Sequence, residues 1–174
     1  MVKYFTKQLA LILGLCALSS YGFAQEENAS DDRLKIKAAL SFAPGFMTEN
    51  TNTVQLQAYL GIRPKSGRIE LRGDAFYFLN SSGDRPRFSM NHQLYAGAFY
   101  RFSDKQFQPY VGFQPGIAYS QSSEYASLNE STGVLSYKKS INPVGSVAGG
   151  VDFFAEKLFF MFVETRYIFG KHKS

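Results

Sequence analysis

The feature that most constrains this chain is the alternation of large apolar side chains with small or polar ones along most of its length. Residues 107–120, FQPYVGFQPGIAYS, show the alternation most clearly. Every odd position from Phe107 to Tyr119 is apolar, whereas every even position except Tyr110 is small or polar. Successive side chains of a β-strand point to opposite faces of the sheet, so a period of two predicts a strand with one apolar face.

The same alternation recurs in six more segments, which are residues 34–46, 54–63, 68–79, 89–102, 141–154 and 158–169. Four phenylalanines fall on the opposite face from the other large apolar residues of their segments: Phe76, Phe78, Phe99 and Phe162. Short connections at 64–67, 103–106 and 155–157 alternate with long ones at 47–53, 80–88 and 121–140. If neighbouring strands are antiparallel, the short turns lie at one end of the sheet and the long loops at the other. This layout predicts an all-β, antiparallel up-and-down barrel.

Alternation alone does not decide which face of the sheet points into the barrel. A secreted soluble barrel of lipocalin type would bury the apolar face, whereas a membrane barrel would present it to lipid. The interior of an eight-stranded barrel is only just wide enough for side chains to fill it, so seven strands of mostly large apolar residues would overfill it. Small residues of the other face, such as Gly61, Gly112 and Ala118, suit a narrow lumen. We therefore expect a transmembrane barrel, whose tilted strands need about 9–11 residues each to span the bilayer.

The N-terminal segment predicts export from the cytoplasm. Basic residues precede an apolar stretch at 9–18, which is shorter than the roughly 20 residues of a membrane-spanning helix. Gly22 and Ala24 then supply the small residues of a secretory cleavage site, and we expect cleavage after Ala24. The expected organisation is a signal peptide at 1–24, a flexible leader at 25–33 and a barrel domain at 34–174.

These features resemble the small outer-membrane β-barrel family of Gram-negative bacteria, of the OmpA/OmpX-like or "porin family" type. The resemblance covers residues 34–169 and rests on the signal peptide, the loop rhythm and segments such as LYAGAFYRF, YVGFQPGIAY and VETRYIFG. It implies an eight-stranded template in the cell outer membrane, with short turns in the periplasm and long loops outside. The implied partners are the outer-membrane lipid and the outer-membrane assembly machinery.

The count of strands departs from that template. Seven strands are recognisable in the sequence, whereas bacterial single-chain barrels have an even number. We expect a truncation before the last strand, because the residues from Lys171 to Ser174 read like the start of another long loop. A missed strand and the pairing of two chains are the alternatives.

The inward face of the predicted barrel carries charges of both signs. Because an unpaired charge in a narrow lumen is costly, these charges should pair. We predict an ion-pair cluster that plugs the lumen, formed by Arg68, Glu70, Arg72, Asp74, Arg101, Asp152, Glu164 and Arg166. Lys35, Lys37 and Arg63 also fall at inward positions. A gate or a path for small solutes is the alternative role of this cluster.

Signals for other chemistry are few. The lipid A deacylases among membrane barrels use a His-x-Ser pair with a later Glu, and His172-Lys173-Ser174 has the spacing but no residue after it. Two His and one Cys give no metal-ligand set, and the net charge of +5 is not clustered as nucleic-acid binding requires. We expect no enzymatic activity and no cofactor, but a structural or surface-interaction role in which the loop 121–140 contacts an extracellular ligand. A narrow porin and a lipid A-modifying hydrolase are the alternatives.

Overall fold

The computed structural model describes residues 20–23, 34–47, 51–83, 88–122, 127–129, 134–136, 139–154 and 159–170. Seven long strands make up most of it: β2 (Leu34–Phe46), β3 (Thr51–Pro64), β4 (Ile69–Gly83), β5 (Phe88–Arg101), β6 (Phe107–Ser122), β9 (Lys139–Phe154) and β10 (Phe159–Gly170). Three short strands complete the set: β1 (Ser20–Phe23), β7 (Ser127–Asn129) and β8 (Val134–Ser136). Within these ranges no helix is long and apolar enough to cross a membrane.

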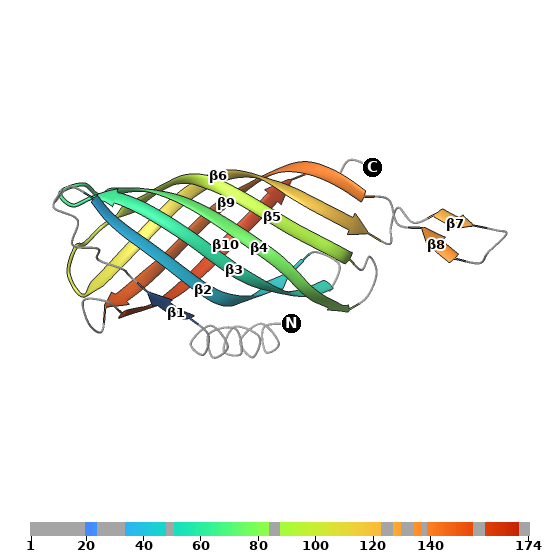
Figure 1. Ribbon diagram of the computed structural model, residues 1–174, viewed down its shortest axis with the longest axis horizontal. Helices are drawn as coiled ribbons and strands as arrows, with labels where there is room; N and C mark the ends of the chain where they lie inside the picture. Colours follow the sequence, from blue (N-terminus) through green and yellow to red (C-terminus); the bar gives the residue numbers. More distant parts are fainter. Residues whose placement is uncertain are drawn as a thin grey trace, which may run out of the picture.

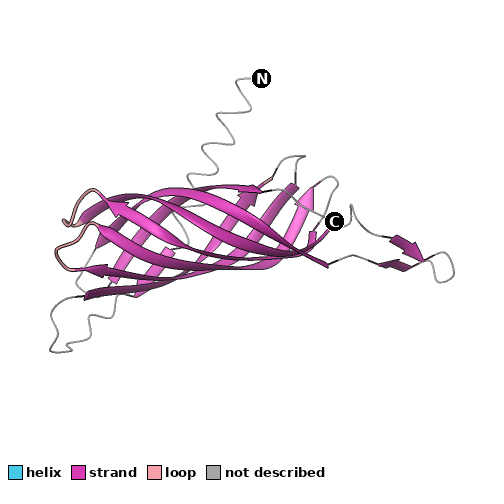
Figure 2. Ribbon diagram, turned by 90° about the horizontal axis from the view of Figure 1, so that it is seen from above, coloured by secondary structure: helices cyan, strands magenta, loops and turns pink. Residues whose placement is uncertain are grey.

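The seven long strands form one antiparallel up-and-down sheet, as the sequence predicted (Figure 1). The strand order β1-β10-β9-β6-β5-β4-β3-β2 closes the sheet into a barrel. Strands β7 and β8 form a separate hairpin that extends beyond one end of the barrel (Figures 1 and 2). Strand β2 has the predicted bounds, and the other long strands differ from the predicted segments by a few residues at their ends.

Backbone hydrogen bonds close the two short turns that the structure describes. At the first turn, the Gly67 N–H donates to the Pro64 carbonyl oxygen at 3.0 Å, which closes a turn between β3 and β4. At the second turn, the Phe102 N–H donates to the Pro109 carbonyl oxygen at 2.9 Å and joins the ends of β5 and β6. The third predicted turn, at 155–157, lies outside the described residues.

Strand β1 was not expected, because its residues belong to the predicted signal peptide at 1–24. It pairs antiparallel with both β2 and β10. Tyr21 is in register with Leu40 of β2 and Met161 of β10. A strand of four residues is too short to show a period of two, which explains why the alternation did not reveal it. The predicted flexible leader at 25–33 lies outside the described residues.

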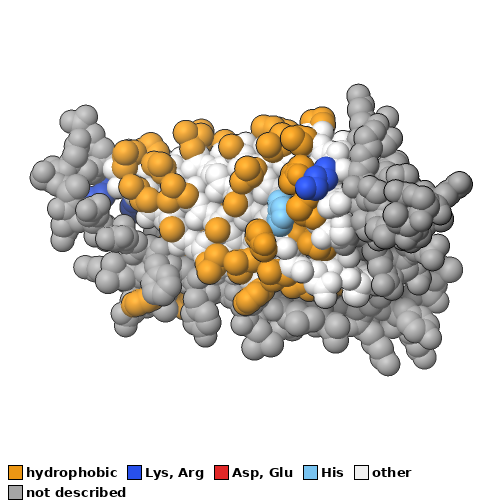
Figure 3. Space-filling view, turned by 45° about the vertical axis from the view of Figure 1, so that its right-hand side comes forward, with side chains coloured by type: hydrophobic (Ala, Val, Ile, Leu, Met, Phe, Trp, Pro, Cys, Tyr) orange, Lys and Arg blue, Asp and Glu red, His pale blue; other side chains and the backbone are white. Residues whose placement is uncertain are grey.

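The barrel wall carries the large apolar side chains on its outside. Leu71, Ile141 and Tyr167 are 66%, 68% and 71% exposed. In Figure 3, apolar side chains spread over the described part of the wall, and the visible Lys and Arg side chains lie towards its ends. The polar and charged residues of the alternating pattern are buried in the lumen. The size of the apolar side chains therefore predicted the orientation of the two faces correctly.

The four phenylalanines that break the alternation are buried inside the barrel: Phe76, Phe78, Phe99 and Phe162. Glycines make room for Phe99 and for Tyr110, another buried ring. A Cβ atom on Gly112 would lie 2.3 Å from the ring of Phe99, its partner in the register between β5 and β6. A Cβ atom on Gly150 would lie 2.7 Å from the hydroxyl oxygen of Tyr110, its partner between β6 and β9. At these two positions a glycine leaves the space in the lumen that its partner's ring occupies.

Candidate functional site

The charged residues of the lumen fall into two groups, one near the short turns and one near the middle of the barrel. We call the first the short-turn cluster, which consists of Lys37, Glu70, Arg101 and Asp152. We call the second the central cluster, which consists of Arg72, Asp74, Glu164 and Arg166. Each cluster holds two acidic and two basic side chains, so its formal charges cancel.

Arg101 is the hub of the short-turn cluster. Its guanidinium group forms a bidentate ion pair with Glu70, donating from Nε to Oε2 at 2.7 Å and from Nη2 to Oε1 at 3.0 Å. Its third nitrogen, Nη1, donates to Asp152 Oδ2 at 2.6 Å. Lys37 Nζ reaches the same Asp152 oxygen at 3.1 Å. Since Glu70, Arg101 and Asp152 are at most 1% exposed, the charges are removed from water and depend on one another.

Neutral groups contribute little to the short-turn cluster. Lys37 Nζ donates to Gln108 Oε1 at 3.3 Å and lies 4.5 Å from the centre of the Phe154 ring. The second oxygen of Asp152, Oδ1, is buried without a hydrogen-bond partner among the described residues. The cluster is therefore held by its ion pairs rather than by a network of hydroxyl and amide groups.

An additional ion pair covers the end of the lumen at the short turns. Arg63, which is 1% exposed, donates from Nη1 to Asp104 Oδ1 in the turn between β5 and β6, and to the Gly67 carbonyl oxygen at 3.3 Å. Slight burial raises the pKa of Asp104, but the hydrogen bond and the positive charge of Arg63 outweigh it and hold that pKa below its ordinary value. This carboxylate is 47% exposed, so it belongs to the rim of the barrel.

In the central cluster each acid is bound by both arginines. Asp74 Oδ1 accepts from Arg72 Nη2 at 2.6 Å and lies 3.1 Å from Arg166 Nη2. Glu164 Oε2 accepts from Arg72 Nη1 at 2.7 Å, and Glu164 Oε1 accepts from Arg166 Nη2 at 2.9 Å. The four side chains come from only two strands, β4 and β10, on which acids and arginines alternate. Alternate residues point to the same face, which is why they meet in the lumen.

Neutral side chains add a second layer of bonds to the central cluster. Gln114 donates to Asp74 Oδ2 at 2.6 Å and accepts from Arg166 Nη1 at 2.5 Å. Gln57 donates to Asp74 Oδ1 at 3.0 Å, and the Tyr110 hydroxyl donates to Glu164 Oε2 at 3.0 Å. Both acids of this cluster therefore retain hydrogen-bond donors when any single arginine is removed.

Aromatic rings enclose the arginines of the central cluster. The Arg72 guanidinium carbon lies 3.7 Å from the centre of the Tyr59 ring and 4.7 Å from that of Phe99. The Arg166 guanidinium carbon lies 5.0 Å from the centre of the Phe76 ring. A cation near an aromatic face is attracted by the ring, most strongly when both are desolvated. Phe99 and Phe76 thus pack against the charges, whereas Phe162 packs in an apolar cluster with Ala39, Tyr59 and Phe160.

Seven of the eight residues predicted for the lumen cluster lie in the two clusters: Glu70, Arg72, Asp74, Arg101, Asp152, Glu164 and Arg166. The placement of Arg68 in the lumen is wrong. Strand β4 begins at Ile69, so Arg68 lies in the preceding turn, where its side chain is exposed and donates to the Tyr100 hydroxyl at 3.3 Å. The prediction omitted Lys37 from the cluster although its inward position was recognised. It also omitted Gln57, Gln114 and Tyr110, because only formal charge was considered.

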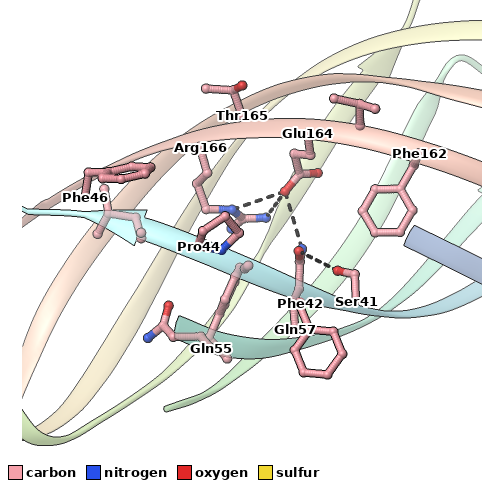
Figure 4. Close-up of a pocket in the computed structure, with 15 residues that line it drawn as sticks. Ser41, Phe42, Pro44, Phe46, Gln55, Gln57, Phe162, Glu164, Thr165 and Arg166 are labelled. Carbon is pink, nitrogen blue, oxygen red and sulfur yellow. Dashed lines mark hydrogen bonds and ion pairs between the residues drawn. The ribbon is translucent and has the colours of Figure 1, made fainter. Parts of the chain in front are cut away.

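A cavity of about 230 Å³ opens between β2 and β10 (Figure 4). Its lining includes Ser41 to Phe46 on β2 and Phe162 to Arg166 on β10. Strand β1 pairs with residues 38–41 of β2 and 159–161 of β10, so the cavity begins where that pairing ends. Glu164 and Arg166 of the central cluster form part of the cavity wall.

The described residues contain no grouping of three or more His, Cys, Asp and Glu side chains that could hold a metal ion. His92 stacks on Tyr77 with ring centres 4.5 Å apart, and its Nδ1 accepts from the Phe78 N–H at 3.2 Å. That arrangement places His92 in a structural contact with its own sheet. The His-x-Ser pair at 172–174 lies outside the described residues.

No protein-family model matches the chain, and no curated protein or solved structure matches it either. What the chain does must therefore be inferred from its own residues.

Proposed function

We propose that the chain is an outer-membrane β-barrel protein of Gram-negative bacteria with a structural or surface-interaction role. One observation carries the proposal: the large apolar side chains lie on the outside of the barrel, whereas ion pairs fill its inside. A monomeric water-soluble protein rarely exposes contiguous apolar patches larger than a few hundred Å². In hydrocarbon the same surface is the favourable one, and a sheet closed into a barrel leaves few backbone groups unpaired.

Aromatic pairs towards both ends of the wall support a membrane setting. At the short-turn end, Phe107 and Phe153 have ring centres 4.8 Å apart, and Tyr100 and Phe102 are 5.2 Å apart. Towards the long-loop end, His92 stacks on Tyr77. Rings at these two levels suit the membrane–water interfaces, where aromatic girdles flank the apolar band of outer-membrane barrels.

The filled lumen favours a structural or binding role over transport. The short-turn cluster, the central cluster and the rings around them occupy the interior from β2 round to β10. Contact with other molecules would then take place at the long-loop end. There the hairpin of β7 and β8, within the loop at 121–140, extends beyond the barrel (Figures 1 and 2). We propose this loop as the contact surface for an extracellular ligand.

The proposal is tested by fractionation and by conductance. Expressed in a Gram-negative host, the protein should enter the outer membrane, need detergent for extraction and migrate as a compact form on gels when it is not boiled. Reconstituted in planar bilayers, it should give no steady single-channel currents. A chain that is water-soluble without detergent, with its phenylalanines inaccessible to apolar probes, would overturn the proposal.

A narrow channel is the second candidate, and the cavity between β2 and β10 is the observation that favours it. Steady currents that change when Glu164 is replaced by Gln would support this candidate against the closed lumen. A lipid A-modifying hydrolase is the third candidate. Mass spectrometry of lipid A from cells with and without the protein tests it.

A further inference from the structure

Strand β1 occupies the seam of the barrel, between the first and the last of the long strands. Gly22 is in register with Ala39 of β2 and with Phe160 of β10. Among the described residues no other strand joins β2 to β10. Residues Ser20–Phe23 are therefore what closes the described sheet into a barrel.

Cleavage after Ala24 would remove this closing strand. The backbone N–H and C=O groups of β2 and β10 that now bond to β1 would then lose their partners. In hydrocarbon each unsatisfied backbone group costs several kcal/mol, because no water can replace the lost bond. The predicted cleavage site therefore conflicts with the closed barrel.

The sequence contains a second cleavage signal upstream of β1. Ala17 and Ser19 are small residues at the −3 and −1 positions of the Ser19–Ser20 bond. The apolar stretch from Leu9 to Cys16 that precedes them falls within the roughly 7–15 residues of a signal-peptide core. Both requirements of an export signal are met without using residues 20–24.

We propose that the leader is cleaved between Ser19 and Ser20, so that Ser20 becomes the first residue of the mature protein and β1 stays in the barrel. The step is a hydrolysis in which water adds across the peptide bond. The carboxyl group remains on Ser19 of the released leader, and a free α-amino group forms on Ser20.

The surroundings of the seam fit a chain that begins at Ser20. Ser20 is in register with Ser41, the residue at which the cavity between β2 and β10 starts. Ser41 donates to Gln57 at 3.3 Å, and Gln57 donates to Glu164 at 3.4 Å, as Figure 4 shows. Side-chain oxygens and a carboxylate at this level can accept hydrogen bonds from an α-ammonium group. The cavity beyond them, of about 230 Å³, leaves space for the new terminus.

The inference rests on the proposed export of the chain, and the first experiment separates the two. The full-length chain is expressed in a Gram-negative host, and the N-terminus of the product is determined by intact mass and N-terminal sequencing. A membrane-inserted protein beginning at Ser20 supports the inference. A membrane-inserted protein beginning at Gln25 overturns it and leaves the proposed function intact. An uncut chain outside the membrane fraction overturns both.

A matched pair of substitutions tests the choice of bond. Phenylalanine at the −1 position blocks a cleavage site that requires a small residue there. Ala24→Phe should leave the mature N-terminus at Ser20 and the yield of compact barrel unchanged. Ser19→Phe should abolish the product that begins at Ser20. If instead Ala24→Phe blocks processing while Ser19→Phe does not, the inference is wrong.

A second pair tests whether the barrel needs β1, independently of the native cleavage signal. An unrelated signal peptide of known cleavage site is fused either to Ser20 or to Gln25. The chain that begins at Gln25 should give at least about tenfold less compact, unboiled barrel than the chain that begins at Ser20, because its seam has lost the paired backbone. Equal yields from the two fusions would contradict a closing role for Ser20–Phe23.

Discussion

The two ion-pair clusters of the lumen have the same charges but differ in how many donors each acid can use. Among the described residues of the short-turn cluster, Glu70 is bound by Arg101 alone, and Asp152 is bound by Arg101 and Lys37. In the central cluster, Asp74 and Glu164 each meet both arginines and neutral donors as well. A buried charge is tolerated only while it is bonded, so the first cluster depends on one residue and the second is redundant.

The two clusters also differ in their position relative to the cavity between β2 and β10. The short-turn cluster takes its four charges from β2, β4, β5 and β9, and none of its residues lines the cavity. The central cluster takes half of its charges from β10, which borders the cavity at the seam. Beside this cavity the additional bonds keep both acids satisfied, although Glu164 and Arg166 line it.

The largest effect is expected for Arg101→Met. This change keeps an unbranched side chain but removes the guanidinium group. Among the described residues it leaves Glu70 without a donor and Asp152 with Lys37 only. Breaking a buried ion pair by removing one partner costs about 3–5 kcal/mol. Urea unfolding in lipid vesicles, followed by far-ultraviolet circular dichroism, should show a loss of this size in the free energy of unfolding. Arg101→Lys should recover only part of the lost free energy, because a lysine ammonium group cannot form the bidentate pair with Glu70.

The matched change in the central cluster, Arg166→Met, should cost less. Asp74 keeps Arg72, Gln57 and Gln114, and Glu164 keeps Arg72 and the Tyr110 hydroxyl. We expect a loss of about 1.5–3 kcal/mol, the range for hydrogen bonds to charged groups. The same unfolding measurement tests it. If Arg166→Met proves as costly as Arg101→Met, the clusters do not differ in redundancy.

The sequence predicted the long strands, their order and the orientation of their faces from three signals: alternation, loop length and side-chain size. A period of two defines the strands, and the size of the apolar residues decides which face fits a narrow lumen. Seven of the predicted cluster residues follow from the same parity, since Glu70, Arg72 and Asp74 alternate on one strand. The prediction for Arg68 was wrong because side chains alternate between the two faces only inside a strand, and β4 begins one residue later, at Ile69.

Two features could not be predicted in this way. Strand β1 is too short for its alternation to be recognised, and its residues also fit an export signal, so local sequence supports two interpretations. The roles of Gln57, Gln114 and Tyr110 depend on which strands face each other across the lumen. Gln57 of β3 and Glu164 of β10 lie on opposite sides of the seam and meet only because the barrel closes. A pattern read along single strands contains no information about contacts across the interior.

A pair of glutamine substitutions sharpens the comparison. Gln114→Leu removes an amide that binds Asp74 and Arg166, so it should cost about 1–2 kcal/mol. Gln108→Leu removes one long bond from Lys37 at 3.3 Å, so it should cost less than about 1 kcal/mol. Both values come from the same urea titration. Equal costs would show that neutral groups support the two clusters alike.

The smallest effect is expected at the rim, where Arg63 meets Asp104. The pKa of Asp104 is held below the ordinary value of 3.8, chiefly by Arg63 acting against slight burial. A carboxylate with a lowered pKa stabilises the fold fully above its unfolded pKa, and this contribution is lost as the pH falls through the lower folded value. Because the side chain is 47% exposed, the contribution should be at most about 0.5 kcal/mol.

Asp104→Asn isolates this rim pair from the two buried clusters. The difference in unfolding midpoint between the parent protein and the variant should be small and constant at neutral pH, and it should shrink towards zero as the pH falls below about 4. The thermal midpoint, measured by circular dichroism at several pH values, provides the test. A difference that persists at the lowest pH would mean that Asp104 acts through its shape and hydrogen bond rather than its charge. The pair would then close the lumen by packing, and the distinction between a charged rim and charged clusters would disappear.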